Sequence, residues 1–150
     1  MIRRRALFIG FGATVLLVSC GGPQAGAVTL VAQGAAGMNA AADGSDRPVT
    51  LQVVQLRGSA AFDGADAFGL QDPAAALGGD LIKTDVIVLA PGGAATKSIA
   101  LDPGVAFVGV IAGFLNPAGK VFRVKAAVGP TDTLTFRLDV GANGLALVPA

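Results

Sequence analysis

The carboxyl side chains that could perform acid–base chemistry in this chain are all aspartates. Ten aspartates are its only acidic residues, and it contains neither histidine nor glutamate. Asp63, Asp66 and Asp72 fall within a span of ten residues, and paired carboxylates can act as general acid and general base. The same segment has helical spacing, however, which favours a helix face for Asp66 and a helix cap for Asp72. Without histidine there is also no Ser-His-Asp triad and no imidazole metal ligand. We therefore predict that the protein is not an enzyme.

A second cluster, Asp43-Gly44-Ser45-Asp46, faintly resembles a calcium loop. A calcium loop needs six or more oxygen ligands and commonly ends in a bidentate glutamate, and this segment supplies neither. A solvated turn explains the four residues better. We expect no metal and no cofactor.

Cys20 is the only cysteine, which excludes an intramolecular disulfide, a Cys-x-x-Cys redox pair and a thiolate zinc site. It follows three arginines at positions 3–5 and an uncharged stretch of thirteen residues at positions 6–18. That stretch is too short for a membrane-spanning helix but typical of a secretory signal peptide. A short transmembrane anchor or a buried helix is the alternative, and the arginine flank argues against both.

The residues Leu17-Val18-Ser19-Cys20 resemble a bacterial lipobox, in which the cysteine sulfur receives a diacylglyceryl group and a peptidase then cuts before the cysteine. Small Ser19 suits that peptidase. We predict a signal peptide at 1–19, lipidated Cys20, a tether at 20–26 and a domain at 27–150. Each buried CH₂ contributes about 0.8 kcal/mol, so two or more acyl chains anchor stably. Gly21, in place of the aspartate that retains enteric lipoproteins at the inner membrane, favours the outer membrane, facing the periplasm.

Composition and patterning favour an all-β domain. Only 14% of residues are charged and the net charge is +1, which argues against a nucleic-acid surface. The 22 glycines and 8 prolines suit a fold with many turns. Hydrophobic alternation and turn signals predict eight strands and hence a two-sheet β-sandwich. The long segment 105–115 is apolar on both faces, as in a central strand. The predicted strands are 27–33, 48–57, 81–90, 95–101, 105–115, 120–128, 133–140 and 145–149.

One segment departs from the strand pattern. Phe62 and Phe68, with Ala65 between them, recur at helical spacing within 60–77, which predicts one or two short helices between strands. Ser59 could cap the first helix, and Asp72-Pro73 could begin the second. We expect both phenylalanines to pack in the core.

The connection 34–47, which we call loop 34–47, is long for a segment without secondary structure, and such loops are functional or simply solvated. Met38 could provide an adaptable apolar contact with a partner. Polar groups around it could complement that partner: Asn39, Asp43, Asp46 and Arg47.

Several short motifs carry a family resemblance through their order and spacing. The sequence resembles the TssJ family (also called SciN or VasD), the outer-membrane lipoprotein of the bacterial type VI secretion system. It departs from the family pattern at Leu115, Phe122 and Asp85, where arginine, tryptophan and glutamate are usual. The matching residues, besides the lipobox, are Met38-Asn39; Pro48, Val49, Leu51, Gln55 and Leu56; Phe62, Ala65, Asp66, Phe68 and Leu70; Leu89, Pro91 and Gly92; Val110, Ala112 and Phe114; and Arg123.

This resemblance implies a transthyretin-like β-sandwich with no catalytic role. It also implies that the protein holds the periplasmic part of TssM within a complex that contains TssL, with loop 34–47 as the TssM contact. A different periplasmic sandwich lipoprotein, such as a pilotin or a carbohydrate-binding module, is the alternative. The absence of tryptophan and tyrosine weakens the carbohydrate-binding version.

The lipobox generates the first testable prediction. In cells grown with a clickable fatty acid, the wild-type protein should become labelled, because Cys20 supplies the acceptor thiol. The variant Cys20→Ser should lose the label and either remain uncleaved or leave the membrane fraction. An unlabelled wild-type protein would contradict the assignment.

Overall fold

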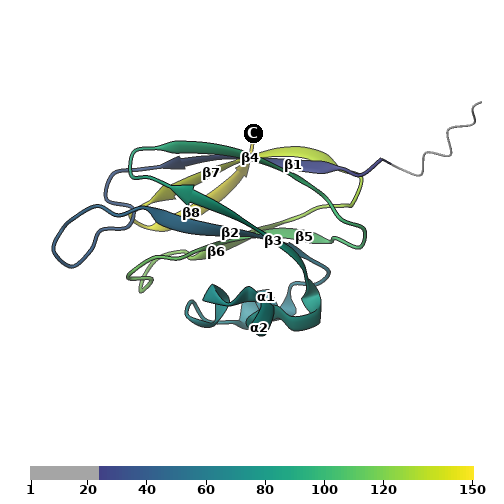
Figure 1. The fold of residues 1–150 in the computed structure, drawn as a ribbon, viewed down its shortest axis with the longest axis horizontal. Coiled ribbons are helices and arrows are strands. Elements are labelled where there is room, and N and C mark those ends of the chain that lie inside the picture. Colours follow the sequence, from purple (N-terminus) through teal and green to yellow (C-terminus); the bar gives the residue numbers. More distant parts are fainter. Residues whose placement is uncertain (1–23) are drawn as a thin grey trace, which may run out of the picture.

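The computed structural model describes residues 24–150, so the predicted signal peptide, Cys20 and residues 21–23 of the tether lie outside the described residues. The molecule has three layers: two four-stranded sheets packed face to face, and a helical insert under the second sheet (Figure 1). The predicted two-sheet sandwich of eight strands with a short helical insert is therefore confirmed.

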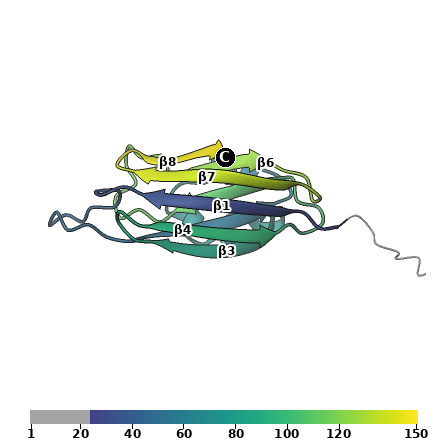
Figure 2. The same cartoon turned by 90° about the horizontal axis from the view of Figure 1, so that it is seen from above.

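The first sheet has the order β4-β1-β7-β8 (Figure 2). Of its two central strands, β1 and β7, β1 pairs antiparallel with β4 and parallel with β7. The strands are β1 (Ala27–Gly34), β4 (Ala94–Ala100), β7 (Thr133–Gly141) and β8 (Gly144–Pro149).

The second sheet has the order β3-β2-β5-β6 and is antiparallel throughout. Its strands are β2 (Val49–Leu56), β3 (Leu81–Leu89), β5 (Phe107–Ala112) and β6 (Arg123–Ala127). The predicted strands 105–115 and 120–128 were too long. Between β5 and β6 the chain leaves this sheet, and Val121 instead forms a parallel bridge with Gly144 of the first sheet.

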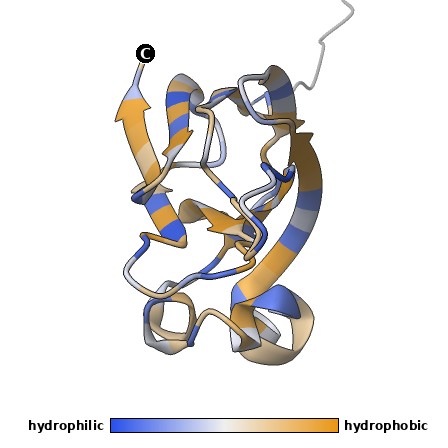
Figure 3. Cartoon of the chain, turned by 90° about the vertical axis from the view of Figure 1, so that its left-hand side faces the viewer, coloured by the Kyte–Doolittle hydropathy of each residue, from blue (hydrophilic) through white to orange (hydrophobic). Residues whose placement is uncertain are grey.

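The strands run between two opposite ends of the sandwich. At the tether end lie residues 24–26, 101–106 and 128–132, where Gly26 N donates to Pro130 O and Leu101 N donates to Gly26 O. At the loop end lie the connections 35–48, 90–93, 113–122 and 142–143. Figure 3 views the molecule from the loop end and shows hydrophobic and hydrophilic residues alternating along the strands.

The second sheet buries most of both faces of its central strands, β2 and β5, because it packs against two partners. Its inner face meets the first sheet, with Leu51, Val53 and Val110 in a core shared with Leu30 and Leu138. Its outer face meets the helical insert, where a separate cluster forms. That cluster consists of Val54, Leu56, Phe62, Leu70, Leu77 and Ile111.

The insert consists of short helices: α1 (Ala60–Gly64), the 3-10 turn η1 (Gly69–Gln71), α2 (Pro73–Leu77) and the 3-10 turn η2 (Gly78–Asp80). No helix within residues 24–150 has the length and apolarity needed to cross a bilayer. Asp72 caps α2 as predicted, because its side chain accepts from Ala75 N. Ser59 occupies the N-cap position of α1 as predicted, but its side chain makes no capping hydrogen bond.

Phe62 and Phe68 have different environments, although the sequence spacing treats them alike. Phe62 is buried in the insert cluster, as expected. The prediction of core packing was wrong for Phe68, which is 89% exposed. The physical reason is that α1 ends at Gly64 and Ala65 is extended, so the helical period that would place both rings on one face is broken.

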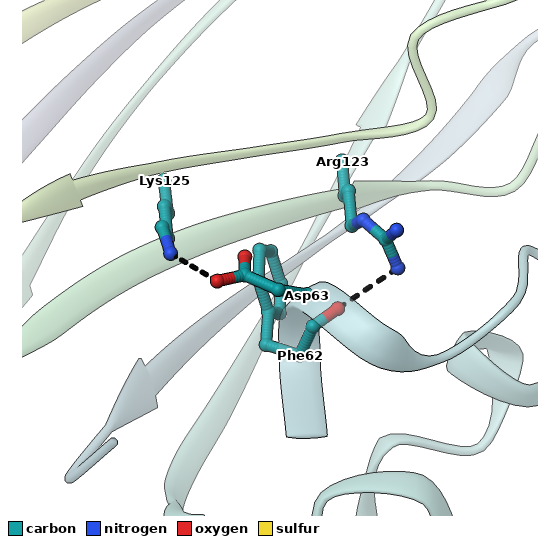
Figure 4. Close-up of polar contacts among 4 residues, drawn as sticks. All are labelled: Phe62, Asp63, Arg123 and Lys125. Atoms are coloured by element: carbon teal, nitrogen blue, oxygen red, sulfur yellow. Dashed lines mark hydrogen bonds and ion pairs between the residues drawn. The ribbon is translucent and has the colours of Figure 1, made fainter. Parts of the chain in front are cut away.

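Two cations of β6 attach the insert to the sheet (Figure 4). Arg123 donates to the carbonyl oxygens of Phe62 and Ala65, and Lys125 lies 2.5 Å from a carboxylate oxygen of Asp63. The Lys125–Asp63 pair is partly exposed, and such pairs contribute little to stability. The arginine contacts satisfy two carbonyls at the end of α1, so they fix the end of α1 against β6.

Gly109 on β5 lets the insert approach the sheet, and this generates a second prediction. A Cβ at this position would lie 2.8 Å from ring atoms of Phe62 and 3.2 Å from Val54 Cγ2. Gly109→Ala should therefore lower the free energy of unfolding by about 1–3 kcal/mol, as overpacking does, measured by urea denaturation. Phe62→Leu removes the clashing atoms and should recover part of the loss. Gly64→Ala is the control, since nothing lies within 4 Å of its added methyl; equal losses at both glycines would contradict the explanation.

Candidate functional site

Loop 34–47 is folded, not an open chain. Ala40 and Asp46 form an antiparallel bridge, Ala41 N donates to Ser45 O over 2.8 Å, and Gly44 N donates to Ala41 O over 2.9 Å. The loop projects as a small hairpin beyond the strands at the loop end (Figure 1). Its backbone groups are thus largely satisfied within the loop, which gives it a defined shape.

Met38 and Asn39 shape the loop from inside. We expected both side chains to face a partner, but Met38 is 0% exposed and Asn39 is 2% exposed. The chain turns back over Gly34, where an added Cβ would lie 2.7 Å from the Met38 sulfur. An apolar residue in a loop of glycine and alanine is buried here because the loop packs back onto the sandwich core.

Two side-chain contacts tie the loop to its surroundings. The Asn39 amide donates to Pro48 O and accepts from Leu115 N, both at 2.9 Å. Lys120 Nζ donates to Met38 O over 3.1 Å and lies 4.8 Å from the centre of the Phe114 ring. Asn39 and Lys120 therefore fasten loop 34–47 to the connection 113–122.

Asp43, Asp46 and Arg47 are exposed, as expected. Asp43 Oδ1 accepts from the Ser45 hydroxyl at 2.5 Å and from Ser45 N at 2.9 Å, and these bonds hold the pKa of Asp43 below its ordinary value. Asp46 Oδ2 accepts from Gly37 N, and Arg47 Nε donates to Ser45 Oγ. Both carboxylates thus order local backbone. Within residues 24–150, no group of three or more His, Cys, Asp or Glu side chains could hold a metal ion.

A shallow cleft of about 500 Å³ opens between loop 34–47 and the outer face of the second sheet. Its lining comes from three parts of the chain: loop 34–47, the start of β2 and the connection after β5. Leu115, 62% exposed, lies at its border. The lining residues are Asn39, Ala41, Arg47, Pro48, Thr50, Gly113 and Leu115.

A smaller hollow of about 160 Å³ continues from this cleft across Leu115 to the insert. Phe68, Phe114, Leu115 and Pro117 line it, together with Gln71. Sequence reasoning missed Leu115 and Phe68 as surface residues. The exposure of Leu115 was indicated by its position next to the Asn116-Pro117 turn. The exposure of Phe68 was indicated by the glycine that follows it. We call Arg47, Pro48, Thr50, Phe68 and Leu115 the loop-end surface.

The three aspartates that could have formed an acid–base site are used separately. Asp63 pairs with Lys125, Asp66 accepts from Gly69 N at 2.6 Å, and Asp72 caps α2. Each therefore has its own structural partner in or beside the insert.

A family model of type VI secretion lipoproteins, T6SS-SciN, described by the names VasD, EvfM and TssJ, matches residues 26–143. The chain belongs to this family. The resemblance to the TssJ family found in the sequence is therefore confirmed, and the protein is a type VI secretion lipoprotein. In sequence, no curated protein matches it.

Solved structures have the same fold as this TssJ-family chain. The type VI lipoprotein TssJ1 from Pseudomonas aeruginosa is 26% identical, with a TM-score of 0.77 over 85% of this chain and 98% of the other. Lip from Serratia marcescens, a membrane-bound component of the type VI secretion system, is 30% identical, with a TM-score of 0.75 over 81% and 96%. A chain in a structure described as the TssM C-terminal domain (869-1107) from EAEC is 28% identical, with a TM-score of 0.67 over 83% and 98%.

The Asp43 turn generates a third prediction. Ser45→Ala removes the hydroxyl that is the largest cause of the lowered pKa, so the Asp43 pKa should rise toward its ordinary value in an NMR titration of the side-chain carboxyl. Because the pKa of Asp43 is depressed in the folded state, its carboxylate stabilises the turn at pH values above its ordinary pKa. That stabilisation is lost as the pH falls through the depressed pKa. An unchanged Asp43 midpoint in Ser45→Ala would contradict the assigned cause.

Proposed function

We propose that this type VI secretion lipoprotein is anchored in the outer membrane, faces the periplasm and holds the periplasmic part of TssM, in a complex that also contains TssL. The observation that carries the proposal is the loop-end surface. It combines a folded loop, an exposed Leu115 and an exposed Phe68 at one end of the sandwich. An apolar centre with a polar rim is the usual composition of a protein-binding surface.

The placement of the two ends supports this role. The described chain enters at the tether end, and β1 carries it directly to loop 34–47 at the other end (Figure 2). At about 3.3 Å per residue, the eight residues of β1 separate the two ends by about 26 Å. A lipid on Cys20 and a tether at 20–26 would hold the tether end near the membrane and point the loop end into the periplasm.

Two further observations support TssM as the partner. The structure of the TssM C-terminal domain from EAEC contains a chain of this fold. The Serratia relative is a membrane-bound component of the same secretion system. We further propose a structural, non-catalytic role, because the chain has no histidine or glutamate and the aspartates of the insert each serve a local contact.

Substitutions on the exposed part of the surface test the proposal. Leu115→Asp places a charge at the apolar centre, and Arg47→Glu reverses the charge on its rim. Each should weaken binding to the periplasmic region of TssM about tenfold or more in calorimetry, since the central residues of an interface dominate its affinity. Melting temperatures should stay near the wild-type value because both side chains are exposed.

Arg137→Glu is the matched control. Arg137 is an exposed arginine on β7 of the first sheet, away from the loop end, and it pairs with Asp139. The Arg137→Glu variant should bind TssM with the affinity of the wild type. A wild-type protein that does not bind TssM would overturn the proposed function, and unchanged affinity in both loop-end variants would move the interface elsewhere.

A further inference from the structure

The contact between Asn39 and its two neighbours requires an amide side chain. Pro48 offers only a carbonyl, which needs a donor, whereas Leu115 offers an N–H, which needs an acceptor. One side-chain amide supplies both in one group. Aspartate would keep the acceptor and lose the donor, and alanine would leave two partly buried backbone groups unpaired, which is costly.

Lys120 makes a second, independent link between the same two segments. Its ammonium donates to the backbone carbonyl of Met38, the residue before Asn39. The loop is therefore held at two adjacent residues, once through its side chain and once through its backbone. Both links end on the connection 113–122, which presents Leu115.

The tether end carries a similar amide bridge, which makes a natural comparison. Gln55 on β2 is 0% exposed; it donates to Ala100 O at 2.9 Å and accepts from Asp102 N at 2.8 Å. Asn39 and Gln55 are the buried polar side chains of residues 24–150. Each joins neighbouring segments at its own end of the sandwich.

We infer that Asn39 is a positioning residue that, with Lys120, locks loop 34–47 to the connection 113–122 so that Arg47 and Leu115 form one preorganised binding surface. Asn39 is only 2% exposed, so we expect it to act through Pro48 and Leu115 and not through a contact with the partner. This inference rests on the proposed function and adds to it. A surface fixed before binding spares the complex the cost of ordering two loops, so the lock contributes to affinity without making a contact.

The lock can be tested first without any partner. Hydrogen exchange followed by NMR reports the Leu115 amide directly, because its N–H donates to Asn39. Asn39→Ala should speed exchange at Leu115 and at the loop amides of Ala41 and Gly44 about tenfold or more, while strand amides stay protected. Asn39→Asp keeps the acceptor and should preserve more protection at Leu115 than Asn39→Ala does. Unchanged exchange in Asn39→Ala would overturn the lock.

Binding to the periplasmic region of TssM then separates positioning from general stability. Asn39→Ala should weaken affinity about tenfold, a loss of preorganisation equal to about 1.4 kcal/mol, and Lys120→Met should weaken it in the same direction. Gln55→Ala is the matched control, because it removes an equivalent buried amide bridge at the tether end. It should lower the melting temperature as Asn39→Ala does, yet leave TssM affinity and loop exchange unchanged.

The outcomes are distinguishable. If Asn39→Ala and Gln55→Ala weaken binding equally, the effect is general stability and the inference is overturned, although the proposed function stands. Faster loop exchange in Asn39→Ala together with unchanged TssM affinity would overturn the inference as well. If the wild type does not bind TssM, the proposed function fails, and with it the claim that the lock serves binding, while the exchange experiment still decides whether the lock exists.

Discussion

The second sheet must bury most of both faces of its central strands, β2 and β5, and the rest of the structure depends on that constraint. Its inner face packs on the first sheet and its outer face packs on the helical insert. β2 and β5 therefore need apolar side chains in both directions, as in Val53-Val54 and Val110-Ile111. Gly109 adds a second requirement, because only a residue without a side chain lets Phe62 approach this closely.

The candidate site lies where this double burial ends. The insert covers Val54, Leu56 and Ile111 near the middle and tether end of the outer face, and Arg123 fixes its position there (Figure 4). Toward the loop end, the insert reaches only as far as the Gln71 side chain beside Gly113, and Thr50 and Gly113 line the open cleft beneath loop 34–47. The cleft is thus bounded by the insert on one side and by the loop on the other.

The sequence predicted those features that depend on local pattern. Alternation along β1 and the doubly apolar β5 indicated a two-sheet sandwich, and Asp72-Pro73 indicated the start of α2, because each signal lies within a few neighbouring residues. Phe68 was misplaced because the helical spacing of the sequence continues past Ala65, where the backbone becomes extended. Met38 and Asn39 were assigned to a surface because their burial depends on tertiary contacts: Met38 packs over Gly34 onto the core, and Asn39 pairs with Leu115, 76 residues later in the chain. No period in the sequence encodes such a contact.

The position of β1 has a mechanical consequence. It leads from the tether end to loop 34–47, and it is hydrogen-bonded on both sides, to β4 over Ala27–Gln33 and to β7 over Ala27–Gly34. A pull between a lipid at one end and a partner at the other would act along the strand, so its hydrogen bonds are loaded together in shear and not opened one after another. Resistance to such a force is set by the rate of forced unfolding, not by equilibrium stability. Under such a pull, β1 would separate from the sheet only by sliding past both neighbouring strands at once.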